Sequence, residues 1–125
     1  MLGSCTVRVA LPTLDDGRQA YVDACASCHG LDAKGHGPVA AELKTTPPDL
    51  TQLAARYGGN FPREIVIQTI TGARAIPAHG PREMPVWSQR FGHAHAATAA
   101  AEVYARRRVE VMTDYLESIQ RRTSN

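Results

Sequence analysis

Cys25-Ala26-Ser27-Cys28-His29 is the stretch of this sequence that decides the fold. Its C-x-x-C-H spacing is typical of covalent haem attachment, because two thiols three residues apart can each add to a vinyl group of one porphyrin. The following His29 then lies under the ring, where a neutral imidazole nitrogen binds iron. The motif predicts one haem c, bound covalently through Cys25 and Cys28.

Two other uses of a C-x-x-C pair compete with this interpretation, namely zinc ribbons and thioredoxin-like redox sites. A zinc ribbon needs a second pair of ligands, and His93 and His95 are too close together to supply an H-x3-5-H pattern. A thioredoxin-like site lies in a βαβ pattern, whereas this chain has almost no strand signal. Haem attachment is therefore favoured, with a zinc site or a plain disulfide as the alternatives.

The second axial ligand of the iron is expected to be Met84, within Arg82-Glu83-Met84-Pro85-Val86-Trp87. A thioether is a common partner to His in electron-transfer haems and raises the reduction potential. Pro85 keeps the residues around Met84 out of a regular helix. Met112 falls on an apolar helix face and suits a core role instead. His79 is the main competitor of Met84, and it would give a bis-His haem of lower potential.

Length and composition predict one domain of 125 residues with few aromatic side chains (6%), so a buried porphyrin would supply much of the core. The net charge of +2 is too small to indicate nucleic acid binding. The basic excess lies late, around Arg106-Arg107-Arg108 and Arg121-Arg122, and fits either a solvated helix face or a surface that steers an acidic protein partner. The sequence contains no run of about 20 apolar residues, the length that would predict a membrane-spanning helix.

Residues 1–14 are predicted to form a leader or tail, and residues 15–125 the folded domain. Leu2-Gly3-Ser4-Cys5 resembles the end of a bacterial lipobox, so residues 1–14 are interpreted as a possible remnant of an export or lipoprotein signal. Membrane attachment is expected only if Cys5 carries a lipid. An ordinary free thiol at Cys5 is the favoured alternative.

A family resemblance enters with the pattern Gly17-x3-Tyr21-x3-Cys25-x2-Cys28-His29, which resembles the N-terminal helix of class I c-type cytochromes. The run from Cys28 to Pro38 is similar to the C-H-G-x-D-x-x-G-x-G-P segment of bacterial periplasmic members. The resemblance, which spans residues 15–122, implies that this helix crosses the C-terminal helix, with Tyr115 or Leu116 meeting Gly17 and Tyr21. It also implies a periplasmic location.

The resemblance further implies a hydrogen-bond acceptor for His29, and the chemistry of three other side chains suggests contacts to the haem propionates. Pro48, in a Pro-x-Leu strip, is the candidate acceptor for the second ring N–H of His29, with Pro38 as its rival and a merely rigid turn as the other interpretation. Arg82 and Trp87 are candidates to meet the haem propionates through a guanidinium and an indole N–H. Arg74 is a third candidate for the same role, and a plain surface position is the alternative interpretation of each arginine.

The expected fold is all-α, a cytochrome c-like bundle of four to five helices around one haem. Expected helices run from about Gly17, capped by Asp15-Asp16, into the haem motif; over Val39–Leu43; over Leu50–Tyr57 after an Asp49 cap; from Pro62 to Gly72; and over Ala94–Arg122.

The predicted function is outer-sphere electron transfer by a monohaem cytochrome that is not itself an enzyme. Its partners would be redox proteins such as a dehydrogenase, an oxidase or another cytochrome, in the bacterial periplasm. An open sixth iron position would instead support a haem enzyme or gas sensor, with His79 as the only close distal acid or base. A module with a C-x-x-C disulfide and no haem is the third possibility.

Overall fold

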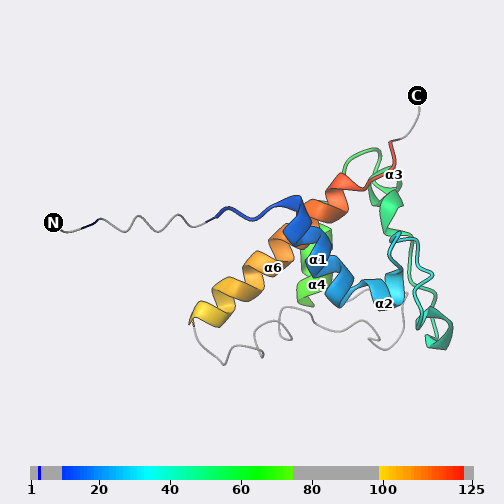
Figure 1. Ribbon diagram of the computed structural model, residues 1–125. Coiled ribbons are helices and arrows are strands. Elements are labelled where there is room, and N and C mark those ends of the chain that lie inside the picture. Colours follow the sequence, from blue (N-terminus) through cyan, green and yellow to red (C-terminus); the bar gives the residue numbers. More distant parts are fainter. Residues whose placement is uncertain (1–2, 4–9, 75–98, 123–125) are drawn as a thin grey trace.

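The computed structural model describes residue 3, residues 10–74 and residues 99–122, and within these parts of the chain it contains helices and no strand. The helices in chain order are α1 (Leu14–Ala24), α2 (Ala26–His29), the short 3-10 helices η1 (Ala40–Glu42) and η2 (Leu50–Gln52), α3 (Leu53–Arg56), α4 (Arg63–Thr71) and α6 (Ala99–Ser118). Figure 1 shows α2 continuing from the end of α1, and α6 crossing behind α1. The predicted all-α fold is confirmed.

Helix α1 begins earlier than the sequence suggested. Its N-cap is Thr13, whose hydroxyl accepts a hydrogen bond from the Asp16 backbone N–H (3.3 Å). The Asp16 carboxylate accepts one from the Thr13 backbone N–H (2.6 Å), which completes a capping box. The predicted start near Gly17 with Asp15-Asp16 as the cap is wrong, because Asp16 occupies the third helical position and bonds back to the cap.

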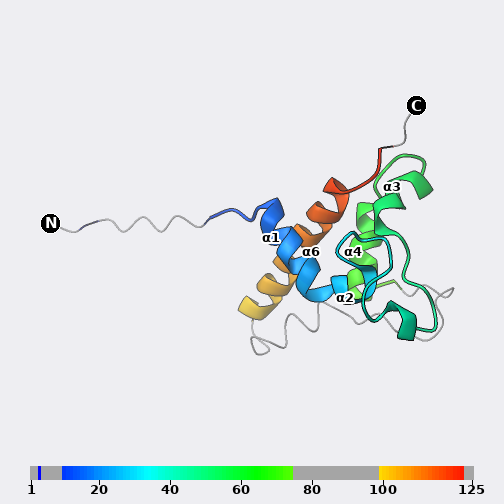
Figure 2. The same cartoon turned by 45° about the vertical axis from the view of Figure 1, so that its right-hand side comes forward.

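The crossing of α1 and α6 forms the centre of the core (Figures 1 and 2). Gly17 lies directly against the backbone carbonyl of Val111, and a Cβ on Gly17 would also stand 3.0 Å from the Tyr115 Cβ. The rings of Tyr21 and Tyr115 meet with centroids 5.4 Å apart. The expected contact of Tyr115 with Gly17 and Tyr21 is therefore confirmed.

Helix α6 is shorter than predicted where its end is described. It ends at Ser118 rather than Arg122, and residues 94–98 of the predicted helix lie outside the described residues. Its apolar stripe points inward as expected, because Val109, Met112 and Leu116 are buried. α4 packs against α6 as well, and its predicted bounds are confirmed by a start after Pro62 and a left-handed Gly72 at its end.

The segment formed by η2 and α3 is less regular than predicted. Asp49 caps it as expected, since its side chain accepts a hydrogen bond from the Thr51 backbone N–H (2.9 Å). The single helix expected over Leu50–Tyr57 is divided into η2 and α3, because Gln52 leaves helical geometry (φ −112°, ψ 12°). None of the described helices is long and apolar enough to cross a membrane.

Candidate haem-binding site

The two thiols of the C-x-x-C-H motif lie where α1 passes into α2. Cys25 joins the two helices and is buried, whereas Cys28 in α2 is partly accessible, and both are free cysteines. Burial is the main reason that the pKa of the Cys25 thiol is raised to about 12, and the charge of the nearby Cys28 adds a smaller effect. Cys25 is therefore protonated at neutral pH. The Met112 sulfur lies 3.4 Å from the Cys25 sulfur, and Met112 is fully buried. The core role expected for Met112 is confirmed.

His29 ends α2 and turns its ring into the protein, with 8% of its surface exposed. Burial lowers the pKa of His29, and the Pro48 carbonyl beside it offsets part of this effect, so the imidazole is neutral at pH 7. The Nδ1 atom lies 3.4 Å from the Pro48 carbonyl oxygen, a long contact. With its proton on Nδ1, the ring donates to Pro48 and leaves the Nε2 lone pair for a metal.

A glycine-rich loop closes over the end of α2. The backbone N–H of Gly35 donates to the His29 carbonyl (2.8 Å), and that of Gly37 donates to the Cys28 carbonyl (3.0 Å). These bonds satisfy carbonyls that the short helix leaves open. A Cβ on Gly37 would overlap the Ser27 carbonyl, which explains why glycine stands there. The loop therefore fixes the backbone of both motif residues at the helix end.

The same loop also holds the strip that carries Pro48. The Leu50 backbone N–H donates to the Ala33 carbonyl (2.8 Å), and Gly35 lies against the Pro47 carbonyl. On the other side of the loop, the buried hydroxyl of Tyr21 donates to the Gly30 carbonyl (2.6 Å). These contacts tie both α1 and the strip that carries Pro48 to the loop that follows His29.

The structure brings together Cys25, Cys28, His29 and Pro48 from the predicted site. Met84, Arg82, Trp87 and the competitor His79 lie outside the described residues, and so does Cys5. Of the remaining candidates, Pro38 and Arg74 are exposed.

Two polar side chains near the site were missed by the sequence interpretation. The Tyr21 hydroxyl bonds to the carbonyl of Gly30, which follows the predicted ligand His29. The Gln120 carboxamide bonds to the carbonyl of Leu50, two residues after the predicted acceptor Pro48. Tyr21 was recognised only as a ring in the helix crossing. Gln120 follows the last apolar position of the predicted helix, and its place in the sequence does not indicate a hydrogen bond to a distant segment.

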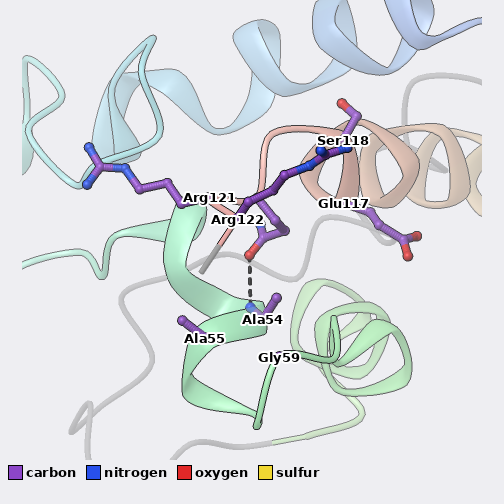
Figure 3. Close-up of a pocket in the computed structure, with 8 residues that line it drawn as sticks. Ala54, Ala55, Gly59, Glu117, Ser118, Arg121 and Arg122 are labelled. Atoms are coloured by element: carbon purple, nitrogen blue, oxygen red, sulfur yellow. Dashed lines mark hydrogen bonds between the residues drawn. The ribbon is translucent and has the colours of Figure 1, made fainter. Parts of the chain in front are cut away.

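A hollow of about 470 Å³ lies away from the haem motif, at the end of α6 (Figure 3). Its lining residues are Ala54, Ala55, Gly59, Glu117, Ser118, Gln120, Arg121 and Arg122. Cys25, Cys28 and His29 are not among them, so this hollow is not the predicted haem site.

A buried neutral histidine that follows two free thiols, with its second ring nitrogen facing a carbonyl, has the donor set of a c-type haem protein. The chain matches the cytochrome c family over residues 14–118, and it belongs to that family. This membership confirms the resemblance to c-type cytochromes. Cytochrome c domains carry electrons, so the expectation of an electron-carrying domain is confirmed at the level of the family.

Curated relatives of this chain are subunits of one kind of oxidase. This chain is 34% identical over 79 residues to the cbb3-type cytochrome c oxidase subunit FixP of Sinorhizobium medicae (63% of this chain, 22% of the relative). It is 32% identical over 90 residues to the subunit CcoP of Azospirillum brasilense (72% and 27%). It is 38% identical over 79 residues to the subunit FixPc of Rhizobium leguminosarum bv. viciae (61% and 22%).

The matched region spans only about a quarter of the length of these relatives. No solved structure gives a significant match.

Proposed function

We propose that this protein is a monohaem c-type cytochrome that carries single electrons between redox proteins by outer-sphere transfer. The observation that carries the proposal is the environment of His29. Its imidazole is buried and neutral, its Nδ1 faces the Pro48 carbonyl, and it follows directly after both free thiols. The Nε2 lone pair is then available to iron, while the acceptor at Nδ1 fixes the tautomer.

Each residue of the proposed site has a separate task. Cys25 and Cys28 would hold the porphyrin covalently, and His29 and Met84 would be the two protein ligands of the iron. The bound haem supplies one-electron chemistry at a potential that the chain sets through ligands, hydrogen bonds and burial. Two protein ligands would leave the iron no open site for a substrate, as expected of a carrier rather than an enzyme.

Arg82 and Trp87 are proposed to bind the haem propionates. A guanidinium pairs with a carboxylate through two parallel hydrogen bonds, and an indole N–H donates one. Both residues flank Met84 in the sequence, so the segment that supplies the distal ligand would also anchor the edge of the porphyrin.

The proposed location is the bacterial periplasm, either soluble or attached to the membrane surface through a lipid on Cys5. The proposed partners are redox proteins, and nucleic acid is not among them. A dehydrogenase, an oxidase and another cytochrome all fit a small carrier. The similarity to subunits of cbb3-type cytochrome c oxidases favours an oxidase complex.

The test is an optical spectrum of protein matured with haem-attachment machinery, oxidised and reduced, for the wild type, Met84→Ala and His79→Ala. We expect a covalent haem c spectrum in all three proteins. A sulfur-to-iron charge-transfer band should be present in the wild type and His79→Ala and absent in Met84→Ala. Intact mass should give one haem per chain.

Other outcomes would overturn parts of the proposal. A band that survives in Met84→Ala excludes that residue as the ligand. If the wild type has no such band and His79→Ala alters its spectrum, His79 is the ligand. A five-coordinate iron in the wild type would favour the haem enzyme or gas sensor. Absence of covalent haem would favour the disulfide module.

A further inference from the structure

The end of α6 is tied to the segment that carries Pro48 through one side chain, that of Gln120. Its Nε2 donates to the Leu50 carbonyl (2.7 Å) and to the Leu116 carbonyl (2.8 Å). Its Oε1 accepts from the Ala54 backbone N–H (2.9 Å), the bond marked by a dashed line at Ala54 in Figure 3. One carboxamide therefore links the last turn of α6 to the start of η2 at Leu50 and to Ala54 in α3.

A backbone bond adds to this link. The Arg121 backbone N–H donates to the Thr51 carbonyl (2.8 Å), so two adjacent residues after α6 bond to two adjacent carbonyls. On the opposite side, the Leu50 backbone N–H donates to the Ala33 carbonyl (2.8 Å). Leu50 is thereby held from both directions, by the loop after the haem motif and by the end of α6.

Pro48 lies only two residues before Leu50, and its own ring gives that stretch little freedom. Its carbonyl contact with the His29 Nδ1 is long, at 3.4 Å, so a small displacement of the strip would lose it. The position of Leu50 therefore decides whether the Pro48 carbonyl stays within reach of the imidazole.

We propose that Gln120 is a positioning residue for the iron ligand: its carboxamide holds Leu50, and through Leu50 it holds the Pro48 carbonyl at the His29 imidazole. The inference rests on the proposed function, in which His29 binds the haem iron. A carbonyl acceptor at Nδ1 makes the imidazole a stronger donor to iron, which favours the ferric state and lowers the reduction potential. Loss of the Gln120 bonds should raise the potential.

The experiment compares Gln120→Met with Gln68→Met in the haem-loaded protein. Methionine has nearly the length of glutamine but cannot replace its hydrogen bonds. Gln68 is a matched control, because within the described parts of the chain its side chain donates to Glu64 of its own helix (3.0 Å) and to no other residue. Two quantities are measured: the reduction potential, and the rate at which the His29 Nδ1–H exchanges with solvent in the reduced protein, followed by NMR.

We expect Gln120→Met to raise the potential and to speed the exchange about tenfold, as the loss of one net hydrogen bond would. Gln68→Met should match the wild type in both quantities. A purely structural role of Gln120 would lower the unfolding temperature while leaving the potential and the ring exchange unchanged, and that result would overturn the inference.

Failure of the inference and failure of the proposed function are distinguishable. A wild type without covalent haem, or with haem that His29 does not ligate, refutes the proposed function. A normal haem spectrum with unchanged values in Gln120→Met refutes only the role of Gln120.

If the Gln120→Met variant cannot be obtained with haem bound, hydrogen exchange in the wild-type protein tests whether Gln120 positions the His29 imidazole. The Ala54 amide and the His29 Nδ1–H should then respond to denaturant in parallel. Exposure of Ala54 at denaturant concentrations that leave the His29 proton protected would overturn the inference.

Discussion

Gly17 of α1 lies so close to the backbone carbonyl of Val111 in α6 that no side chain fits between them. This contact lets the two helices cross at backbone distance and brings the Tyr21 and Tyr115 rings together, with centroids 5.4 Å apart. Tyr21 in turn reaches the Gly30 carbonyl, next to His29. The helix crossing and the candidate ligand are therefore parts of one packed unit.

The variant Gly17→Ala should destabilise the haem-loaded protein by at least about 2 kcal/mol, because the new methyl group overlaps a backbone carbonyl that cannot rotate away. Denaturant unfolding measures the difference. Gly3→Ala is the control, since a Cβ on Gly3 meets nothing within 4 Å. Equal stabilities of the two variants would contradict the close crossing.

Tyr21→Phe removes the buried hydroxyl that donates to the Gly30 carbonyl over 2.6 Å. That carbonyl keeps a second donor, the Ala33 backbone N–H at 3.1 Å, so the expected loss is about 1 kcal/mol of unfolding free energy. Thermal unfolding of the haem-loaded variant measures it. Tyr115→Phe is the control, because it keeps the ring pair and leaves the Gly30 bond intact. An equal or larger loss of unfolding free energy in Tyr115→Phe would contradict a specific stabilising role of the Tyr21 hydroxyl.

The capping box of α1 should make the folding stability depend on pH in the acid range. Hydrogen bonds from the Thr13 backbone N–H and hydroxyl hold the pKa of Asp16 below its usual value. A lowered pKa in the folded state means that the ionised carboxylate stabilises the fold at neutral pH, and that this contribution is lost as the pH falls through the lowered pKa.

Asp16→Asn should therefore lower the melting temperature at pH 7 and make little difference near the acid limit. Asp15→Asn, which removes the same charge from the same turn, is the control. A melting difference for Asp16→Asn that is independent of pH would argue against the ionised cap.

The ion pairs between α4 and α6 should contribute little. Arg63 contacts Asp114 (2.6 Å) and Glu117 (3.1 Å), but these side chains are 40–51% exposed. Water and salt screen such pairs, so Arg63→Met should cost less than about 1 kcal/mol, and the cost should shrink further in high salt. Urea unfolding at two salt concentrations tests this, and a cost that does not respond to salt would indicate lost packing instead.

The sequence was sufficient for the class of fold and for the centre of the site. The C-x-x-C-H spacing, the glycines after it and the Gly17–Tyr21 pattern are all local, and local spacing determines which atoms share a helix face. Helix ends were less predictable. Thr13, Asp15 and Asp16 are all suitable N-cap residues by type, and only the hydrogen bonds of the folded structure show that Thr13 is the N-cap.

The sequence by itself determined that two thiols and an imidazole occupy one helical turn, because their relative positions follow from covalent connectivity and helix geometry. The tertiary structure decided what surrounds them. Pro48 lies 19 residues after His29, and Gln120 lies 70 residues after Leu50, so their meeting depends on how α6, the loop and the strip pack together. Packing of distant segments buries the imidazole and lowers its pKa. The Pro48 acceptor was expected through the family resemblance, whereas no local pattern in the chain indicates the bonds of Gln120.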